Sequence, residues 1–276
     1  MKFDNFENYG EIDVDLYDAF KSFDLNRYKH ILTKLSMFGT FVSPTISSLT
    51  KNSFFLRHDV DLSLNNTHTL FNIERELGIL SHFYFLTGAP SYDINSPKFK
   101  AIITEIQEHG SCIGLHFERL NMSMTVEHEF KMQIELLENS INSEIIHFSP
   151  HNPGSLLNTE IPGLSDKYVN AYSVVNDLEF GYISDSNGRW EENFLIEFLG
   201  SLGKKPYEIL IHPEWWTNNS LDPLSRIIQV YSDSYLDNLC NFAAYHKKSL
   251  KFNESEIAKF ENQIDLIAKS ISEIIE

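Results

Sequence analysis

The stretch SFFLRHDVD at positions 53–61 combines an apolar run with two closely spaced carboxylates. Its aromatic and aliphatic side chains favour a buried β-strand over residues 53–59. Alternate side chains of an extended segment share a face, so Asp59 and Asp61 are expected to point the same way. In a low-dielectric site, two adjacent carboxylates both stay ionised only beside a cation. Without a cation, they share a proton. The stretch therefore predicts a strand that ends at a cation-binding edge.

The same two carboxylates have a structural alternative, which is to cap the helix that follows the strand. Ser63 and Asn65 lie closer to the expected start of that helix, and both residue types are good N-caps. We therefore favour a functional site in which Asp61 binds a divalent metal and Asp59 stays free to accept a proton.

Outward from this stretch, short apolar runs alternate with amphipathic segments, the pattern of repeated βα units. Strands are predicted at residues 53–59, 82–86, 112–117, 145–149, 170–175, 180–184 and 208–212. Helical spacing of apolar residues predicts helices at 67–77, 99–106 and 126–141. Seven strands separated mostly by helices favour an α/β barrel over a doubly wound open sheet, and no glycine-rich nucleotide loop follows any strand.

The two ends of the chain differ from this middle part. Residues 1–49 are expected to form an extension with one helix at 25–38, and residues 217–276 are helical in pattern. An apolar stripe in the second region comprises Ile257, Phe260, Ile264, Ile267 and Ile271. Such a stripe predicts a packing surface or a homodimer contact. We expect one domain over residues 1–276, with its barrel core at about 50–216.

Composition excludes several classes of function. The 39 acidic residues outnumber the 22 basic ones, for a net charge of −17, whereas nucleic-acid binding requires an excess of positive charge. No segment approaches the roughly 20 apolar residues that span a bilayer. The acidic start lacks an apolar signal segment, so the expected location is the cytoplasm. Cys112 and Cys240, far apart, indicate no disulfide framework and no thiolate zinc site.

Residues capable of chemistry gather at the carboxyl ends of five predicted strands, where parallel α/β barrels build their sites. The five segments are RHDVD at 57–61, GLHFE at 114–118, HFSPHNP at 147–153, ISDSNGRW at 183–190 and IHPEWW at 211–216. A single coincidence of this kind would be weak, but five predict one composite site.

Two histidines in these segments are candidate metal ligands. A lone histidine such as His116, at the end of an apolar strand, is most often a core residue, but the aspartate pair favours a ligand role. Catalytic zinc usually takes three protein ligands, and neutral imidazole is a common one. His151 lies between Pro150 and Pro153, which favour an extended, rigid turn suited to a ligand. His147 lies within the strand and is interpreted as structural.

The last segments suggest acid catalysis and sugar binding. His212 ends a strand just before Pro213, and a histidine of ordinary pKa protonates a leaving group at neutral pH. A helix cap or surface imidazole is its structural alternative. Trp190, Trp215 and Trp216 offer flat faces that stack on sugar rings, although adjacent tryptophans equally often belong to a core.

From about residue 54 to 216 the sequence resembles the polysaccharide deacetylase superfamily (NodB-like, carbohydrate esterase family 4). Within it, the chain is most similar to deacetylases found with surface-polysaccharide gene clusters. The shared stretches are RHDVD at 57–61, SDSNGRW at 184–190 and HPEWW at 212–216. The resemblance implies a NodB-like barrel, Zn²⁺ or another divalent metal, and removal of an acetyl or formyl group from an N- or O-acylated sugar. A role in surface-polysaccharide (lipopolysaccharide) biosynthesis is implied as well.

The resemblance also implies roles for individual residues. Asp59 corresponds to the catalytic base and His212 to the general acid, while Asp61 and His116 correspond to metal ligands. His151 is the predicted third ligand. For substrate binding we predict Arg189 together with the three tryptophans.

The chain departs from the family pattern at two places. The usual second motif has another histidine four residues after the first, and here that position is Leu120. His151 is the predicted replacement, because its segment occupies the place of the third motif, and His58 is the next candidate. The third motif normally carries an arginine, but Ser149 stands nearest that position, so Arg189 is predicted to supply the missing positive charge.

Two rival functions remain. Leu120 supports a catalytically degenerate, deacetylase-like carbohydrate-binding protein that has lost its metal. A metal-free glycoside hydrolase fits less well, because its two carboxylates lie roughly 5–9 Å apart on opposite sides of a sugar, whereas Asp59 and Asp61 are neighbours in sequence.

Overall fold

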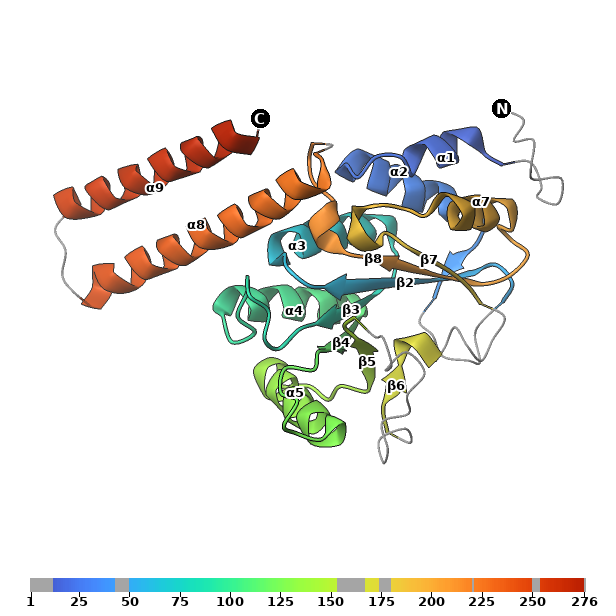
Figure 1. Ribbon diagram of the computed structural model, residues 1–276, viewed down its shortest axis with the longest axis horizontal. Coiled ribbons are helices and arrows are strands. Elements are labelled where there is room, and N and C mark those ends of the chain that lie inside the picture. Colours follow the sequence, from blue (N-terminus) through green and yellow to red (C-terminus); the bar gives the residue numbers. More distant parts are fainter. Residues whose placement is uncertain are drawn as a thin grey trace.

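A parallel β-sheet forms the centre of the protein in the computed structural model (Figure 1). The structure describes residues 12–42, 50–152, 167–173, 180–219, 221–249 and 254–275. The strands are β1 (Thr40–Phe41), β2 (Ser53–Val60), β3 (His82–Phe85), β4 (Cys112–Phe117), β5 (His147–Pro150), β6 (Val169–Asn170), β7 (Gly181–Ser184) and β8 (Tyr207–Ile211). Their order is β6-β5-β4-β3-β2-β8-β7, with β1 pairing the start of β2. Every strand pair is parallel.

Helices cover the outside of the sheet, several of them connecting its strands, while the last two helices of the chain extend to one side of it (Figure 1). They are α1 (Val14–Ala19), α2 (Leu25–Leu35), α3 (Leu64–Leu77), α4 (Pro97–His109), α5 (Val126–Ile141), α7 (Glu192–Gly200), α8 (Pro223–Ser249) and α9 (Glu254–Ile275). Short 3₁₀ turns, η3 (Ser186–Gly188) and η4 (Pro213–Trp215), follow β7 and β8. Ser63 caps α3, and Gly78 ends it in the left-handed conformation that glycine adopts without strain. The alternation predicted from sequence is therefore confirmed.

The sheet curls strongly instead of lying open. The ring of Tyr172, just after β6, lies 6.4 Å from that of Tyr182 on β7, although these strands stand at opposite ends of the strand order. Across the inside of the curl, Arg57 of β2 hydrogen-bonds Ser149 of β5. Within the described residues β6 and β7 share no backbone pairing, so the curl is a half barrel. The prediction of a NodB-like α/β barrel fold is confirmed.

Alternate side chains of β2 face opposite sides, and this alternation creates the site. Phe54 and Leu56 point outward and pack with helices α1, α2 and α7. A second apolar cluster fills the space between α3, α4, α5 and strands β3, β4 and β5. Arg57 and Asp59 point into the curl, where they meet each other and Glu208 of β8. Both faces of β2 are thus buried, but only the inner face is charged.

The N-terminal region differs from its prediction. Its described part, residues 12–42, contains two helices, whereas one was predicted. The helix α1 was missed because its six residues are too few to show a period. Leu16 and Phe20 of this region, with Tyr28 and Ile31 of α2, belong to the apolar cluster behind β2 and β8. The predicted strand at 170–175 is also shorter: β6 covers two residues, 171–173 are helical, and 174–175 lie outside the described residues.

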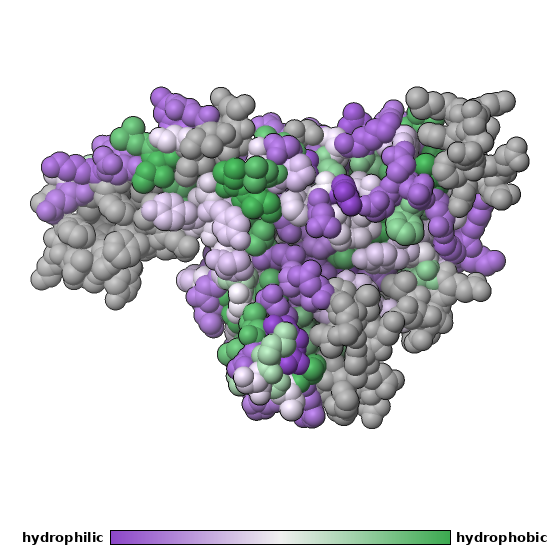
Figure 2. Space-filling model, in the orientation of Figure 1, coloured by the Kyte–Doolittle hydropathy of each residue, from purple (hydrophilic) through white to green (hydrophobic). Residues whose placement is uncertain are grey.

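At the C-terminal end, α8 and α9 run antiparallel beside each other (Figure 1). The side chains of Ile257, Phe260, Ile264 and Ile271 lie outside the described residues, so the dimer contact stays a prediction. No described helix combines the length and the apolar character that crossing a membrane requires. Hydrophilic side chains cover much of the coloured surface in Figure 2, in keeping with the net charge of −17.

Candidate metal centre and catalytic site

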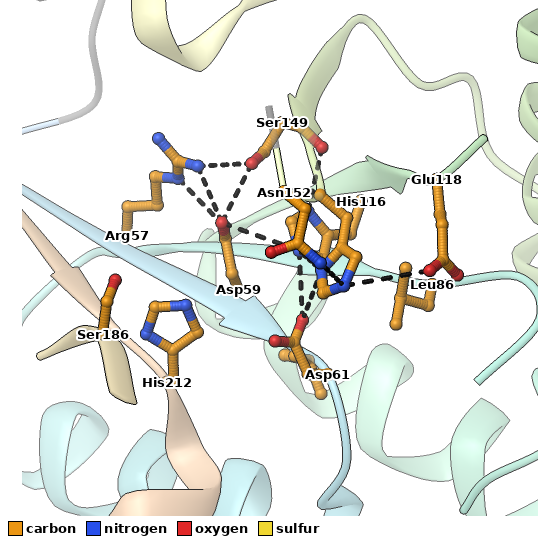
Figure 3. A network of polar contacts seen from close by, with 12 residues as sticks. Arg57, Asp59, Asp61, Leu86, His116, Glu118, Ser149, Asn152, Ser186 and His212 are labelled. Carbon is orange, nitrogen blue, oxygen red and sulfur yellow. Dashed lines mark hydrogen bonds and ion pairs between the residues drawn. The ribbon is translucent and has the colours of Figure 1, made fainter. Parts of the chain in front are cut away.

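Five side chains predicted from sequence meet at the carboxyl edge of the curled sheet, and Figure 3 labels four of them, Asp59, Asp61, His116 and His212. Asp59 lies at the end of β2, and Asp61 follows that strand directly. His116 stands on β4, while His151 and His212 follow β5 and β8. The strands are parallel, so their carboxyl ends converge and bring together residues that lie up to 153 positions apart in the sequence (59 to 212).

Asp61, His116 and His151 form a compact cluster whose ligand atoms all lie within 4.8 Å of one another. His116 Nε2 is 3.0 Å from Asp61 Oδ1 and 3.0 Å from His151 Nδ1. His151 Nδ1 is 3.4 Å from the same Asp61 oxygen. His116 Nδ1 lies 2.9 Å from the carbonyl oxygen of Ser149, to which it donates. This bond leaves the lone pair on Nε2 free, as a metal-binding histidine requires.

The cluster fits a divalent transition metal. Ligand atoms about 2.0–2.1 Å from a tetrahedral zinc ion lie roughly 3.3 Å apart, close to the three separations found here. One carboxylate and two imidazoles match the donors that zinc prefers, and three ligands leave a position for substrate or water. Burial opposes ionisation of Asp61, but hydrogen bonds with His116 and His151 hold its pKa well below its ordinary value. The carboxylate is therefore ionised and able to bind a cation.

Asp59 is held in place by an arginine on its own strand (Figure 3). Arg57 Nε and Nη2 donate to the two carboxylate oxygens of Asp59 at 2.9 and 2.7 Å. Ser149 Oγ donates a third hydrogen bond at 3.0 Å. Arg57 also donates to Glu208 at 2.7 Å and lies over the Tyr172 ring, 4.2 Å from its centroid. These contacts fix the orientation of both charged groups.

Burial and the charge of Arg57 together determine how readily the carboxyl groups of Asp59 and Glu208 ionise. Burial by itself raises the pKa of Asp59, but the positive charge and the hydrogen bonds of Arg57 outweigh burial and hold the pKa below the ordinary value. For Glu208, burial raises the pKa to about 7 despite Arg57. Asp59 is thus ionised at neutral pH, whereas Glu208 is only about half ionised at pH 7. Asp59 lies near the Asp61–His116–His151 cluster, with its Oδ2 atom 3.7 Å from His116 Nε2.

Arg57 replaces Arg189 as the source of positive charge, which corrects the sequence prediction. The Arg189 side chain is 71% exposed and pairs with Glu191 at 2.9 Å, not with Asp59. Ser149, at the position of the family arginine, contacts Asp59 with its hydroxyl group. The two-residue spacing of Arg57 and Asp59 was a signal that could have found this pair, because it places both on one face of the strand.

His212 is paired with a buried aspartate that the sequence reasoning missed. Its Nδ1 atom lies 2.8 Å from Asp185 Oδ1, and its backbone N–H donates to the same carboxylate. Trp216 Nε1 donates to the other oxygen at 2.9 Å. Burial lowers the pKa of His212, but the hydrogen bond and charge of Asp185 outweigh it, with smaller contributions from Glu214 and Asp59, and raise the pKa to about 10. The imidazole is therefore protonated at neutral pH.

The three tryptophans pack in or against the apolar cluster that contains Phe23. Trp216 is 1% exposed and packs between the rings of Phe23 and Tyr28, so the predicted sugar contact is corrected to a core position. Trp190 stacks on Phe23 with centroids 6.2 Å apart, and Trp215 packs partly buried against the same apolar cluster. The buried indole of Trp216 offers no face to a ligand, whereas Trp190 and Trp215 are half-buried and their sugar contact stays a prediction.

Two further positions decide the ligand set. Leu120, at the family's usual histidine position, is 58% exposed and stands outside the cluster, whereas His151 lies inside it. His58 points to the outer face of the sheet, where its Nε2 is 2.9 Å from Glu74. His58 is therefore excluded by geometry as an alternative third ligand.

No family model and no curated protein matches the chain. Among solved structures it is similar to the family 4 esterase domain of a multidomain xylanase from the hindgut metagenome of Trinervitermes trinervoides, at 14% identity over 68% of this chain and 82% of that chain, with a TM-score of 0.39. A polysaccharide deacetylase from Bacillus cereus is similar at 15% identity, over 58% and 78%, with a TM-score of 0.39. A chitin deacetylase from Colletotrichum lindemuthianum is similar at 12% identity, over 66% and 81%, with a TM-score of 0.42.

Proposed function

We propose that this protein is a metal-dependent hydrolase that removes an acetyl or formyl group from an N- or O-acylated sugar. The observation that carries the proposal is the Asp61–His116–His151 cluster, with an ionised carboxylate on one side and a protonated imidazole on the other. A base and an acid with pKa values shifted apart are what acyl hydrolysis needs. The motif resemblance supports the choice of an acylated sugar.

Asp61, His116 and His151 would hold the metal. When bound, a divalent cation such as Zn²⁺ supplies Lewis-acid polarisation of the acyl carbonyl and of the attacking water. The Nδ1–H bond from His116 to the Ser149 carbonyl orients one imidazole for this role. The Nε2 atom of His151 lies 2.8 Å from the side-chain amide nitrogen of Asn152.

Asp59 is the general base in this proposal. Arg57 and Ser149 occupy its carboxylate from the side and fix its direction, so the group needs no reorganisation when water approaches. It accepts a proton from water as the oxygen attacks the acyl carbon. The positive charge of Arg57 keeps the carboxylate ionised before that step.

His212 is the general acid. Its protonated imidazole donates a proton to the sugar nitrogen or oxygen as the bond to the acyl carbon breaks. Asp185 accepts from Nδ1 and from the backbone N–H, which leaves Nε2 as the donor toward the substrate. The transfer of one proton to Asp59 and one from His212 balances the hydrolysis.

The wider role in this proposal rests on the motif resemblance. Deacetylases with the same RHDVD, SDSxGRW and HPxWW stretches accompany surface-polysaccharide genes, so we infer a sugar-containing precursor as substrate and the cytoplasm as location.

The test is metal content and acyl release, measured on wild type, His151→Ala and the control His128→Ala. His128 is an exposed histidine on α5 outside the site. We expect about one metal per chain in wild type and control by elemental mass spectrometry, and loss of metal and of acetate release in His151→Ala. A folded wild type that binds no added zinc would favour a degenerate carbohydrate-binding protein. Metal retained in His151→Ala would remove His151 from the ligand set.

A further inference from the structure

Asn152, directly after His151, adopts a backbone conformation that residues with a side chain rarely take. Its φ value is 45°, in the left-handed region. Asparagine enters this region more readily than most residues, but such conformations carry strain and gather at functional sites. Among the described residues, Asn142 and Asn187 are the other two non-glycine residues with positive φ. Asn142 closes helix α5, a common place for this conformation, whereas Asn152 follows a strand.

In this conformation the Asn152 amide lies against the imidazole of its neighbour. Asn152 Nδ2 lies 2.8 Å from His151 Nε2. The backbone N–H of His151 donates to the carbonyl of Phe117 at 2.7 Å, which holds the segment against β4. Glu118 Oε1 lies 3.8 Å from the same Nε2 atom, beyond hydrogen-bonding distance. Of these two neighbours, Asn152 is therefore the one that hydrogen-bonds the outer nitrogen of His151.

The inner nitrogen of His151 faces the metal cluster. His151 Nδ1 lies 3.0 Å from His116 Nε2 and 3.4 Å from Asp61 Oδ1. His116 donates from its own Nδ1 to the Ser149 carbonyl, so its Nε2 atom is an acceptor. A neutral His151 that contacts His116 therefore carries its proton on Nδ1, and its Nε2 accepts from the Asn152 amide.

Metal binding reverses these roles at His151. When Nδ1 gives its lone pair to a metal, the proton of the neutral ring is on Nε2, which then needs an acceptor in place of a donor. The Asn152 side chain carries a donor and an acceptor on one amide, and half a turn about its Cβ–Cγ bond exchanges them. One residue can thus pair with either tautomer of His151.

We propose that Asn152 is a positioning residue of the metal centre: its amide oxygen accepts from His151 Nε2–H and so directs the Nδ1 lone pair toward the metal. The proposal rests on the metal site of the proposed function. Histidine ligands commonly donate their second N–H to an oxygen acceptor, and loss of that acceptor lowers metal affinity by about 10–100-fold. His116 uses a backbone carbonyl for this purpose, whereas His151 uses a side chain that can be replaced.

The test is zinc affinity, measured by competition with a chromophoric chelator. Asn152→Gly keeps the left-handed backbone without strain and removes only the amide. Asn152 is exposed, so water takes the place of the amide, and we expect binding about tenfold weaker than in wild type. Asn152→Asp keeps an acceptor and tolerates the same conformation, so it should bind zinc at least as tightly as wild type.

The matched control is Asn142→Gly, which makes the same change at a left-handed asparagine at the end of α5. It should leave zinc affinity unchanged. Nitrogen NMR of the zinc-loaded wild type supplies a second readout, because it reports which ring nitrogen of His151 carries the proton. We expect the proton on Nε2, and a proton on Nδ1 would overturn the assignment.

Equal zinc affinity in Asn152→Gly and wild type, or equal losses in Asn152→Gly and Asn152→Asp, would also overturn it. A loss in Glu118→Gln without one in Asn152→Gly would transfer the role to Glu118.

Acyl release is measured separately on the same samples, so that the two proposals can fail independently. A wild type that binds zinc, and binds it more weakly in Asn152→Gly, but releases no acyl group contradicts the proposed hydrolysis and leaves the role of Asn152 standing. Turnover by a wild type whose zinc affinity is unchanged in Asn152→Gly does the reverse. A wild type that binds no zinc contradicts both.

Discussion

The site contains two aspartate–histidine groups with the same chemical components and opposite surroundings. In the first, Asp61 faces the nitrogens of His116 and His151, which converge within hydrogen-bonding distance. In the second, the fully buried Asp185 accepts from the backbone and ring of His212 and from the indole of Trp216.

The difference shows that the remaining partners of an aspartate decide what its histidine does. Asp185 is saturated by donors, so it stabilises a protonated imidazole and has no oxygen left for a cation. Asp61 meets two imidazoles that are themselves able to be neutral ligands, and a metal can bind all three groups at once. The same residue types therefore favour an acid at one end of the site and a metal-binding group at the other, because their partners differ.

The largest expected effect separates the two groups by metal content. Asp61→Asn should lose the bound metal and with it all measurable turnover, because a neutral amide is a poor ligand for a divalent ion. Asp185→Asn should retain about one metal per chain. Elemental mass spectrometry of both purified variants measures this, and metal loss in Asp185→Asn would mean that the two groups are not independent.

The next effect concerns the acid itself. His212→Gln should lower turnover of an acylated amino sugar by about 10²–10⁴-fold with metal unchanged. With a 4-nitrophenyl ester the loss should be much smaller, because that leaving group departs without a proton. Steady-state rates on both substrates check the prediction. An equal loss on the two would assign His212 to binding or structure instead.

A smaller effect is a shift of the pH profile. With a pKa of about 10, His212 is protonated below that pH and loses its proton as the pH rises through it, so the rate falls on the alkaline side. Asp185→Asn should move this fall toward pH 6.5, because the main cause of the raised pKa is gone. At pH 8 only about one imidazole in 30 would remain protonated. A rate profile that keeps its alkaline limit would contradict the Asp185 assignment.

The smallest effect tests the saturation of Asp185. Trp216→Phe keeps an aromatic ring in the core but removes one donor to the carboxylate. We expect a loss of about 1–3 kcal/mol in the free energy of unfolding, measured by urea denaturation, with turnover within a few-fold of wild type. Tyr28→Phe, which leaves the indole nitrogen of Trp216 in place, serves as a second core variant. A change of metal content in Trp216→Phe would mean that the Asp185–His212 group influences the metal-binding group.

Much of the site was accessible from sequence because strand ends mark it. Asp59, Asp61, His116, His151 and His212 each follow an apolar run, and parallel strands bring such ends together. Asp185 lay in one of the quoted segments, but short polar runs in a loop do not show which carboxylate turns inward. The N-terminal helix α1 was missed because six residues carry too short a period.

By itself, the sequence determined the alternating strands and helices and the side to which Asp59 and Asp61 point, and its charge argues against a nucleic-acid partner. These follow from local periodicity and from charge, which need no knowledge of distant residues. Tertiary structure alone decided that Ser149 hydrogen-bonds Asp59 and that Trp216 is core. Such contacts join positions far apart in the sequence, 90 residues between Asp59 and Ser149 and 193 between Phe23 and Trp216, so local periodicity does not reveal them.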